Sequence, residues 1–371
     1  MLLLLLFVPV ALGLGYFAPD RHVPIFVTSA LAILPLAGYI GHATEALAER
    51  LGGGIGGLLN ATFGNAAELI IGILALREGL TDLVKASLTG SIIGNVLLVF
   101  GLSALVGGLR NPVQRFNRTA AGMGTTMLLL SAIGLLVPAV FHYLARGKGA
   151  PELKLDTEIA IVLLLTYCVS LVFTLGTHRS LYGVTAEDAR SLPDERTLST
   201  RNAVFMLLGA TAAVAVVSEL LVGAMSASAE SLGLSQLFMG VIVVALVGNA
   251  AEHYSAIVLA ARNEMDAAIS IAVGSSTQIA LFVAPVLLLL SYAIAPRPMD
   301  LLFTVFEILA IVVSVLSIGF IAHDGETHWM EGHPVAGGLP HSRARLLFPA
   351  LATAHSELLD QRQVLAIAGA G

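Results

Sequence analysis

Long apolar runs separated by short polar connections follow one another along most of the chain. Each run approaches the ~20 apolar residues that a helix needs to cross a bilayer, and none shows the alternation expected of membrane β-strands. Gly, Pro and charged residues mark the connections. The pattern predicts an all-α polytopic membrane protein with ten spans, near residues 1–18, 24–41, 55–76, 86–109, 119–142, 158–176, 202–226, 236–261, 267–293 and 300–322.

The first run, Met1 to Ala18, begins without the positively charged segment that precedes the apolar core of a signal peptide. No small-residue cleavage site of the A-x-A type follows it. We therefore expect this run to be retained as the first span, and cleavage as a signal peptide is the alternative.

One connection near the middle of the chain is long and polar, from Thr177 to Arg201. It is either a plain solvated linker or a regulatory, cation-sensing or gating segment, and its acidic residues are Glu187, Asp188, Asp194 and Glu195. The predicted organisation is an N-terminal helix (1–18), a first half (19–177), this acidic linker (178–200), a second half (201–332) and a tail (333–371).

The Lys and Arg residues of the connections indicate an orientation. They are slightly more numerous in the alternate connections that include the central linker, and the positive-inside rule then puts the linker and the N-terminus in the cytoplasm. We expect a multi-pass protein of the cell inner (plasma) membrane.

The tail after Gly332 does not follow the pattern of the preceding runs. Its longest apolar stretch, near 346–354, contains Pro349 and has charged residues on both sides. About nine residues cannot cross a hydrocarbon core of about 30 Å, and the flanking charges would be costly at its centre. The sequence predicts that residues 333–371 do not form an eleventh span.

Composition agrees with the membrane assignment. Hydrophobic residues make up 57% of the 371 residues, charged residues 12%, and the mean hydropathy is +0.88. These values exclude a soluble globular domain and a disordered chain. The single cysteine, Cys168, excludes a disulfide framework. A net charge of −6 without a basic stripe argues against a nucleic-acid partner.

A five-residue motif occurs twice. Gly64-Asn65-Ala66-Ala67-Glu68 recurs as Gly248-Asn249-Ala250-Ala251-Glu252, and with the same offset Gly90-Ser91 aligns with Gly274-Ser275. The two copies lie five spans apart, and an odd number of spans reverses the direction of crossing. The two halves are therefore an inverted repeat, an architecture of many secondary transporters, whose ion site lies near the bilayer midplane between the repeats.

Each motif places an acid inside an apolar span, at Glu68 and Glu252, where a charge is costly and usually functional. Asn65 and Asn249 lie three residues earlier and share a helix face with these acids. Carboxylate and amide oxygens are ligands that suit Ca²⁺. Burial and a second nearby acid both disfavour a charged carboxylate, so the same pair can hold protons instead. The prediction is one site at which a cation and protons exclude each other.

Further polar residues are candidates for a proton or cation pathway. Some lie in the spans after each motif, some precede a motif, and one directly follows the second acid: Ser91, Asn95, Ser275, Thr277 and Gln278; Glu45 and Glu219; and His253. For each, a structural hydrogen bond or an interfacial position is the alternative. Gln278 aligns with Gly94, and Asn95 with Ile279, so the two half-sites are not chemically identical.

Around the two motifs the sequence resembles the paired repeat signatures of the calcium/cation–proton exchangers, the CAX family of the cation/Ca²⁺ exchanger superfamily. The resemblance extends through Leu58–Phe63, Leu88–Asn95 and Gly274–Ala280 and covers roughly residues 1 to 332. It implies an extra first helix, two inverted five-helix repeats and a cytosolic acidic segment between them. It also implies that the acids matching Glu68 and Glu252 bind Ca²⁺ and H⁺ alternately. The tail does not match the last helix of the family's second repeat.

The expected function is a secondary transporter that exchanges Ca²⁺ for H⁺ by alternating access. A cation channel with an acidic selectivity site and an exchanger of Na⁺ or another divalent cation are the alternatives; sodium–calcium exchangers carry different, Ser/Thr-rich signatures. No nucleophile–base set and no H-E-x-x-H motif indicates an enzyme. We expect no cofactor, and Ca²⁺, protons and the lipid bilayer as partners; a homo-oligomer stays open.

Overall fold

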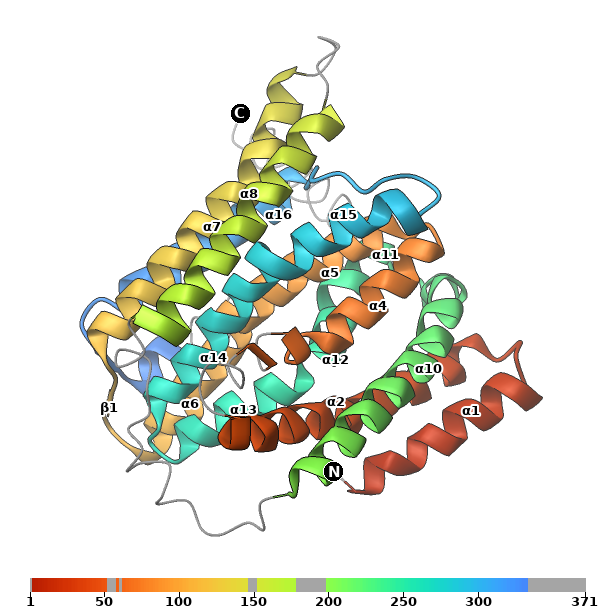
Figure 1. Ribbon diagram of the computed structural model, residues 1–371, viewed down its shortest axis with the longest axis horizontal. Helices are drawn as coiled ribbons and strands as arrows, with labels where there is room; N and C mark the ends of the chain where they lie inside the picture. The colour runs from red at the N-terminus through yellow and green to blue at the C-terminus, as the bar shows by residue number, and fades with distance from the viewer. Residues whose placement is uncertain (1, 52–57, 60–61, 146–151, 178–197, 333–371) are drawn as a thin grey trace, which may run out of the picture.

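The computed structural model describes residues 2–51, 58–59, 62–145, 152–177 and 198–332 (Figure 1). The first half begins with a 3₁₀ helix and also contains two π-helical segments. Its elements are η1 (Leu2–Leu6), α1 (Phe7–Phe17), α2 (His22–Leu51), α4 (Ala66–Arg77), α5 (Thr81–Ile93), η2 (Gly94–Val99), α6 (Phe100–Arg110), β1 (Gln114–Arg115), α7 (Arg118–Ala145), α8 (Glu152–Val172) and η3 (Phe173–Thr177).

The second half has the same kinds of element, with π-helical segments again inside long helical runs. Its elements are α10 (Thr200–Leu232), α11 (Gln236–Phe238), η5 (Met239–Val244), α12 (Ala245–Gly248), α13 (Ala250–Ala261), α14 (Met265–Gln278), η6 (Ile279–Val283), α15 (Ala284–Ile294), α16 (Val305–Ile321) and β2 (Glu326–Thr327). The segment η6 follows α14 at the place where η2 follows α5, as the inverted repeat requires.

Within the described residues the ten predicted apolar runs are mainly helical, with short breaks at the two motifs and a non-helical start of the last run, residues 300–304. Within the described residues, six helical runs are long and apolar enough to cross a membrane, and a bent pair, Gln236–Gly248 with Ala250–Ala261, makes a seventh. Two shorter apolar helices, Leu3–Phe17 and Val305–Ile321, match the first and last runs. The run near 55–76 is described in part and contains α4. The all-α polytopic fold is confirmed.

Three predictions concern residues outside the described part of the chain. The acidic linker falls largely within the undescribed residues 178–197, and the tail within 333–371. The absence of an eleventh span therefore stays a prediction, and so do the exact domain boundaries.

The predicted span boundaries differ from the observed helix ends. α2 continues to Leu51 and α5 begins at Thr81, because hydropathy marks the apolar middle of a span and not its polar turns. The last span begins late, at Val305, after a capping box in which the Thr304 side chain accepts from the backbone N–H of Glu307 and the Glu307 carboxylate accepts from Thr304. Residues 300–304 are not helical.

The two halves meet through close helix contacts that small residues permit. α5 packs against η5, and a Cβ placed on Gly90 would overlap the backbone of Val241. On the other helix, a Cβ on Gly240 would come within 2.6 Å of Ala86 Cβ and 2.7 Å of the Leu83 carbonyl oxygen. Such small-residue contacts are typical of membrane helix pairs. They bring the site-bearing helices of both halves together.

The helices end on two opposite faces of the molecule. On the first, here called the linker face, α6 and α13 end and α10 and α14 begin; Gln114 Nε2 donates to the Ala260 carbonyl oxygen at 2.8 Å, and β1 pairs with β2 there (Figure 1). On the second, the far face, α4 and α15 end and α5 begins, and Gly79 packs on Pro296. α2 and α10 lie side by side at one flank, and α7 and α8 at the other (Figure 1).

Candidate functional site

Both repeated motifs lie where a span is broken. Asn65 and Asn249 have nearly identical backbone angles outside the helical range, φ −97° and ψ 19° for Asn65 and φ −95° and ψ 10° for Asn249. At Asn249 the two parts of the span are bent by 62°. Glu68 and Glu252 then lie in the first turns of α4 and α13. The positive end of a helix dipole favours negative charge at such a place.

The Glu68 side chain crosses to the other repeat and packs on its glycine. A Cβ on Gly248 would lie 3.0 Å from Glu68 Cγ and 3.2 Å from its Cδ, so a larger residue would displace the acid. The carboxyl group lies near the Asn249 side chain. Both of its oxygens are buried, and among the described residues neither has a hydrogen-bond partner. Glu68 therefore presents free lone pairs at the interface between the repeats.

Glu252 has different surroundings. The Ser275 hydroxyl donates to Glu252 Oε2. Ser275 also receives a hydrogen bond from Asn95 Nδ2 at 2.9 Å, and the same Nδ2 lies 3.2 Å from Asn249 Oδ1. The second acid is thus already held by a hydroxyl group that belongs to a larger polar network.

The network extends to both repeats. Asn249 Nδ2 donates to Ser91 Oγ at 2.8 Å and to the Ala245 carbonyl oxygen at 2.9 Å. His253 Nε2 lies 2.8 Å from Asn95 Oδ1. Because an amide oxygen only accepts hydrogen bonds, this contact assigns the proton to His253 Nε2. The predicted pathway residues Ser91, Asn95, Ser275 and His253 are therefore one connected group around the second motif.

The first motif is tied to one pathway residue. Asn65 Nδ2 donates to Gln278 Oε1 at 2.6 Å, and among the described residues Asn65 Oδ1 has no partner. Gln278 aligns with Gly94, which has no side chain and so cannot accept the equivalent hydrogen bond from Asn249. The predicted chemical difference between the half-sites is thus visible in the hydrogen bonds of Asn65 and Asn249.

A cavity of about 290 Å³ leads away from the second acid. Its lining includes residues of α2, both motifs, α13 and α14: Ala37, Ile40, Gly41, Glu45, Phe63, Gly64, Ala67, Gly248, Ala251, Glu252, Ser255, Ser270, Ile271, Gly274, Ser275 and Gln278. Ser270 and Glu45 are exposed and lie near the linker-face ends of α14 and α2. The cavity therefore extends from Glu252 toward the linker face, with Glu68 behind Gly248.

Some predicted pathway residues fall elsewhere. Glu219 is exposed on α10 and is not part of the cavity lining, and the Thr277 hydroxyl donates to the Val273 carbonyl oxygen of its own helix at 2.8 Å. The four linker acids lie outside the described residues. Ser255 and Ser270 line the cavity without having been predicted. Their signal in the sequence was weak, since an isolated serine in an apolar helix usually bonds its own backbone.

The donor set suits a hard cation or protons. Carboxylate, amide and hydroxyl oxygens converge between the repeats, and these are the ligand types that Ca²⁺ takes. Within the described part of the chain, no three His, Cys, Asp or Glu residues gather as a metal cluster. The arrangement offers two carboxylates and neutral oxygens, and the imidazole of His253 in the same network uses its Nε2 to donate to Asn95.

Comparisons with known proteins show the family of this chain. The family model described as "Sodium/calcium exchanger protein" matches residues 21–176 and 202–334. A protein of Aphanothece halophytica named "Ca(2+)/H(+) antiporter" is 44% identical over 341 residues, which cover 89% of this chain and 91% of that protein. "Ca(2+)/H(+) antiporter ChaA" of Bacillus subtilis is 47% identical over 310 residues, 83% of this chain and 87% of that protein.

Solved structures are similar over nearly the whole chain. The structure described as "Structure of native YfkE" matches with a TM-score of 0.80 and 41% identity, covering 94% of this chain and 99% of that one. The structure described as "Crystal Structure of H+/Ca2+ Exchanger CAX" matches with a TM-score of 0.71 at 16% identity, which bears on the fold alone.

Proposed function

Because the chain belongs to the sodium/calcium exchanger protein family, we propose that it is a multi-pass Ca²⁺/H⁺ antiporter of the plasma membrane. The observation that carries the proposal is the pairing of Glu68 and Glu252 at equivalent helix breaks of an inverted repeat. The names of the similar antiporters support Ca²⁺ and H⁺ as the exchanged ions.

The chemistry follows from shared ligands. Two ionised carboxylates balance the charge of one Ca²⁺, and the amide oxygens of the motif and water complete its shell. When protons occupy the same oxygens, the cation loses its ligands. Glu68, whose oxygens have no partner among the described residues, has the larger free binding capacity. Of the two motif acids, Glu252 is the one that lines the cavity, so an entering ion meets it before Glu68.

Alternating access requires one open and one closed path. The cavity at Glu252 supports an open path toward the linker face, which the Lys and Arg distribution puts in the cytoplasm. In the proposed cycle, Ca²⁺ enters through this cavity, the repeats rearrange about the fixed site, and protons return from the far side. Glu45, exposed in the cavity lining, attracts the cation at the entrance.

The test is Ca²⁺ uptake into proteoliposomes of the purified full chain, with and without an imposed pH gradient. We expect uptake that needs the gradient and collapses when an ionophore dissipates it. Uptake that follows the Ca²⁺ gradient and voltage alone would identify a channel, and uptake driven by a Na⁺ gradient would identify a sodium-coupled exchanger. The exposed Glu158→Gln serves as a matched control for substitutions in the site, because it neutralises an acid on the surface of α8.

A further inference from the structure

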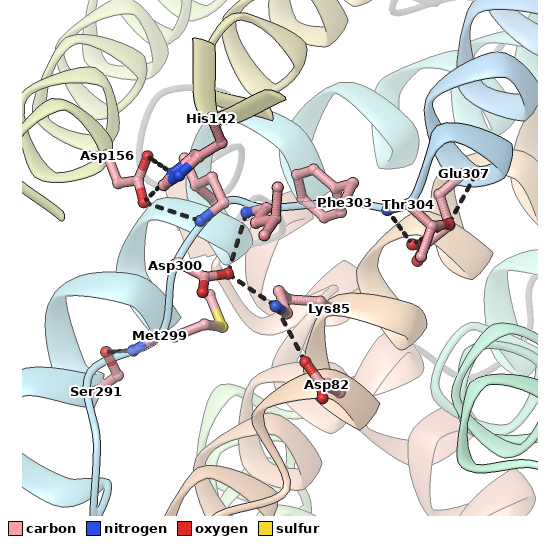
Figure 2. Close-up of polar contacts among 12 residues, drawn as sticks. Asp82, Lys85, His142, Asp156, Ser291, Met299, Asp300, Phe303, Thr304 and Glu307 are labelled. Atoms are coloured by element: carbon pink, nitrogen blue, oxygen red, sulfur yellow. Dashed lines mark hydrogen bonds and ion pairs between the residues drawn. The ribbon is translucent and has the colours of Figure 1, made fainter. Parts of the chain in front are cut away.

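A group of polar side chains from the first repeat holds the connection between α15 and α16 at the far face (Figure 2). Lys85 Nζ donates to Asp300 Oδ1 at 2.7 Å and lies 3.1 Å from Asp82 Oδ1. The Lys85 side chain is only 11% exposed, against 37% for Asp300 and 85% for Asp82. Lys85 and Asp300 thus form an ion pair between the two repeats in which the lysine is largely buried and the acid is partly exposed.

Other contacts hold the same connection from α7 and α8. The backbone N–H of Leu301 donates to Asp156 Oδ2 at 3.2 Å, and His142 Nε2 lies 3.2 Å from both Asp156 oxygens. The Tyr143 hydroxyl donates to the Phe303 carbonyl oxygen at 3.1 Å. Figure 2 shows His142 and Asp156 beside one short stretch of chain, in which Leu301 and Phe303 are buried. The stretch is fastened by three helices of the other repeat.

The attachment continues along α5 toward the ion site. The Thr89 hydroxyl donates to Glu307 Oε1 at 2.8 Å, and two residues further along the helix Ser91 belongs to the site network. Six residues separate Lys85 from Ser91, or about 9 Å along a helix. The helix that carries Glu68, α4, runs toward the far face, and just after its end Gly79 packs on Pro296 of the same connection.

The corresponding place on the linker face is built differently. With the offset of the repeat, Asp82 aligns with Asp266, which accepts a hydrogen bond from the backbone N–H of Asn117 in the matching connection. The positions of Lys85 and Asp300, however, are taken by Ile269 and Phe116. These two line a small cavity of about 80 Å³. The linker face therefore lacks the ion pair at the equivalent place.

We propose that Lys85 and Asp300 are the lock of the far face: their contact keeps the path from Glu68 to that face shut while the cavity is open to the linker face. When the connection moves away from α5, Lys85 loses Asp300; because the Lys85 side chain is only 11% exposed, the lock opens only as water enters to solvate it. Opening of the far face is thereby coupled to its hydration. The role of the lock in transport rests on the proposed exchange function. The ion pair itself rests on the contacts of Lys85.

Side-specific cysteine labelling tests the lock without measuring transport. The native Cys168 is first replaced by serine, since it is the one cysteine of the sequence. Ala75→Cys then places a thiol seven residues after Glu68, on the same face of α4 and toward the far face, at a position that is 1% exposed. Ser270→Cys reports the linker-face cavity. A membrane-impermeant thiol reagent is applied from each side.

We expect Lys85→Met and Asp300→Asn each to raise the rate of Ala75→Cys labelling from the far side by about tenfold or more, because each removes the ion pair that joins α5 to the connection. Asp82 cannot replace Asp300 in this contact, since it lies on α5 itself. The double exchange Lys85→Asp with Asp300→Lys should return the rate toward that of the parent. Lys154→Met, which removes a 75% exposed lysine near the same face, is the matched control and should change nothing.

Two results would overturn the lock. One is an unchanged Ala75→Cys rate in both single variants. The other is an equal rise at Ala75→Cys and Ser270→Cys, which would show general loosening and no control of one side. Because neither readout needs an ion gradient, failure of the lock and failure of Ca²⁺/H⁺ exchange are measured separately.

Discussion

Glu68 and Glu252 begin from the same five-residue motif and the same break in a helix, yet their surroundings differ. Glu252 accepts from Ser275 and lines the cavity, within a network that includes Asn95 and Asn249. Glu68 lies behind Gly248, and its oxygens have no partner among the described residues. A duplicated motif therefore gives one acid that is hydrogen-bonded and lines the cavity, and one that is enclosed and has no hydrogen-bond partner among the described residues.

The largest expected effect comes from removing either carboxylate. Glu68→Gln and Glu252→Gln should each lower pH-gradient-driven Ca²⁺ uptake by ~100-fold or more, because a single carboxylate leaves a bound Ca²⁺ with net charge in a low-dielectric place. Uptake into proteoliposomes measures this, with Glu158→Gln as the control. Substantial exchange by either variant would show that its acid is not a shared ligand.

The next expected effect is the pH dependence of Ca²⁺ binding. Protons occupy the same oxygens as the cation, so the apparent affinity should fall as the pH falls. We expect a loss of ~10-fold or more between about pH 8 and pH 5, the range that brackets buried carboxylates, and the two acids titrate as one coupled pair. Equilibrium Ca²⁺ binding to the purified protein measures it. An affinity that is flat over this range would separate the proton site from the cation site.

Substitutions outside the acids should separate the two half-sites. Asn95→Ile, which copies the aligned Ile279, removes the partner of Asn249, Ser275 and His253 and should weaken Ca²⁺ binding by ~10-fold, because it leaves buried polar groups unpaired. Gln278→Leu removes one neutral hydrogen bond to Asn65 and should weaken Ca²⁺ binding by about threefold. Isothermal titration with Ca²⁺ measures the affinity of both variants. Equal losses of affinity would contradict the difference between the half-sites.

The smallest expected effect concerns stability. Glu68→Gln replaces a buried acid that has no partner among the described residues and should raise the melting temperature by roughly 2 °C. Glu252→Gln should give a smaller rise, because the wild-type acid already has the Ser275 hydroxyl. Thermal unfolding in detergent without Ca²⁺ measures both. Equal shifts would show that the two acids are solvated alike.

Sequence alone predicted the features that depend on long patterns. The apolar runs predicted the helices because burial in lipid requires about 20 apolar residues whatever the neighbours are. The offset between Gly64 and Gly248 predicted the inverted repeat, and Gln278 facing Gly94 predicted unequal half-sites. These arguments need no knowledge of which helices touch.

Contacts between distant helices were the part that could not be predicted. Lys85 and Asp300 are 215 residues apart and lie at the polar edges of apolar runs, where a charge usually faces water. The predicted spans began at residues 86 and 300, which put Lys85 in a connection and Asp300 at the start of a helix. The structure corrects both, because α5 begins earlier and α16 later. Only the folding of that connection onto α5 covers the pair.

The cavity at Glu252 also determines how the molecule meets the electric field of the membrane. When water fills this cavity, it carries the potential of the linker-face solution to Glu252, and most of the voltage then falls across the layer between the acids and the far face. Moving one elementary charge through the full potential changes its energy by ~2.3 kcal/mol per 100 mV. Asn249 lies near the middle of its span by residue count, yet electrically the site lies close to the linker side. In the proposed cycle, an ion that leaves through the far face would therefore cross nearly the whole field in one step.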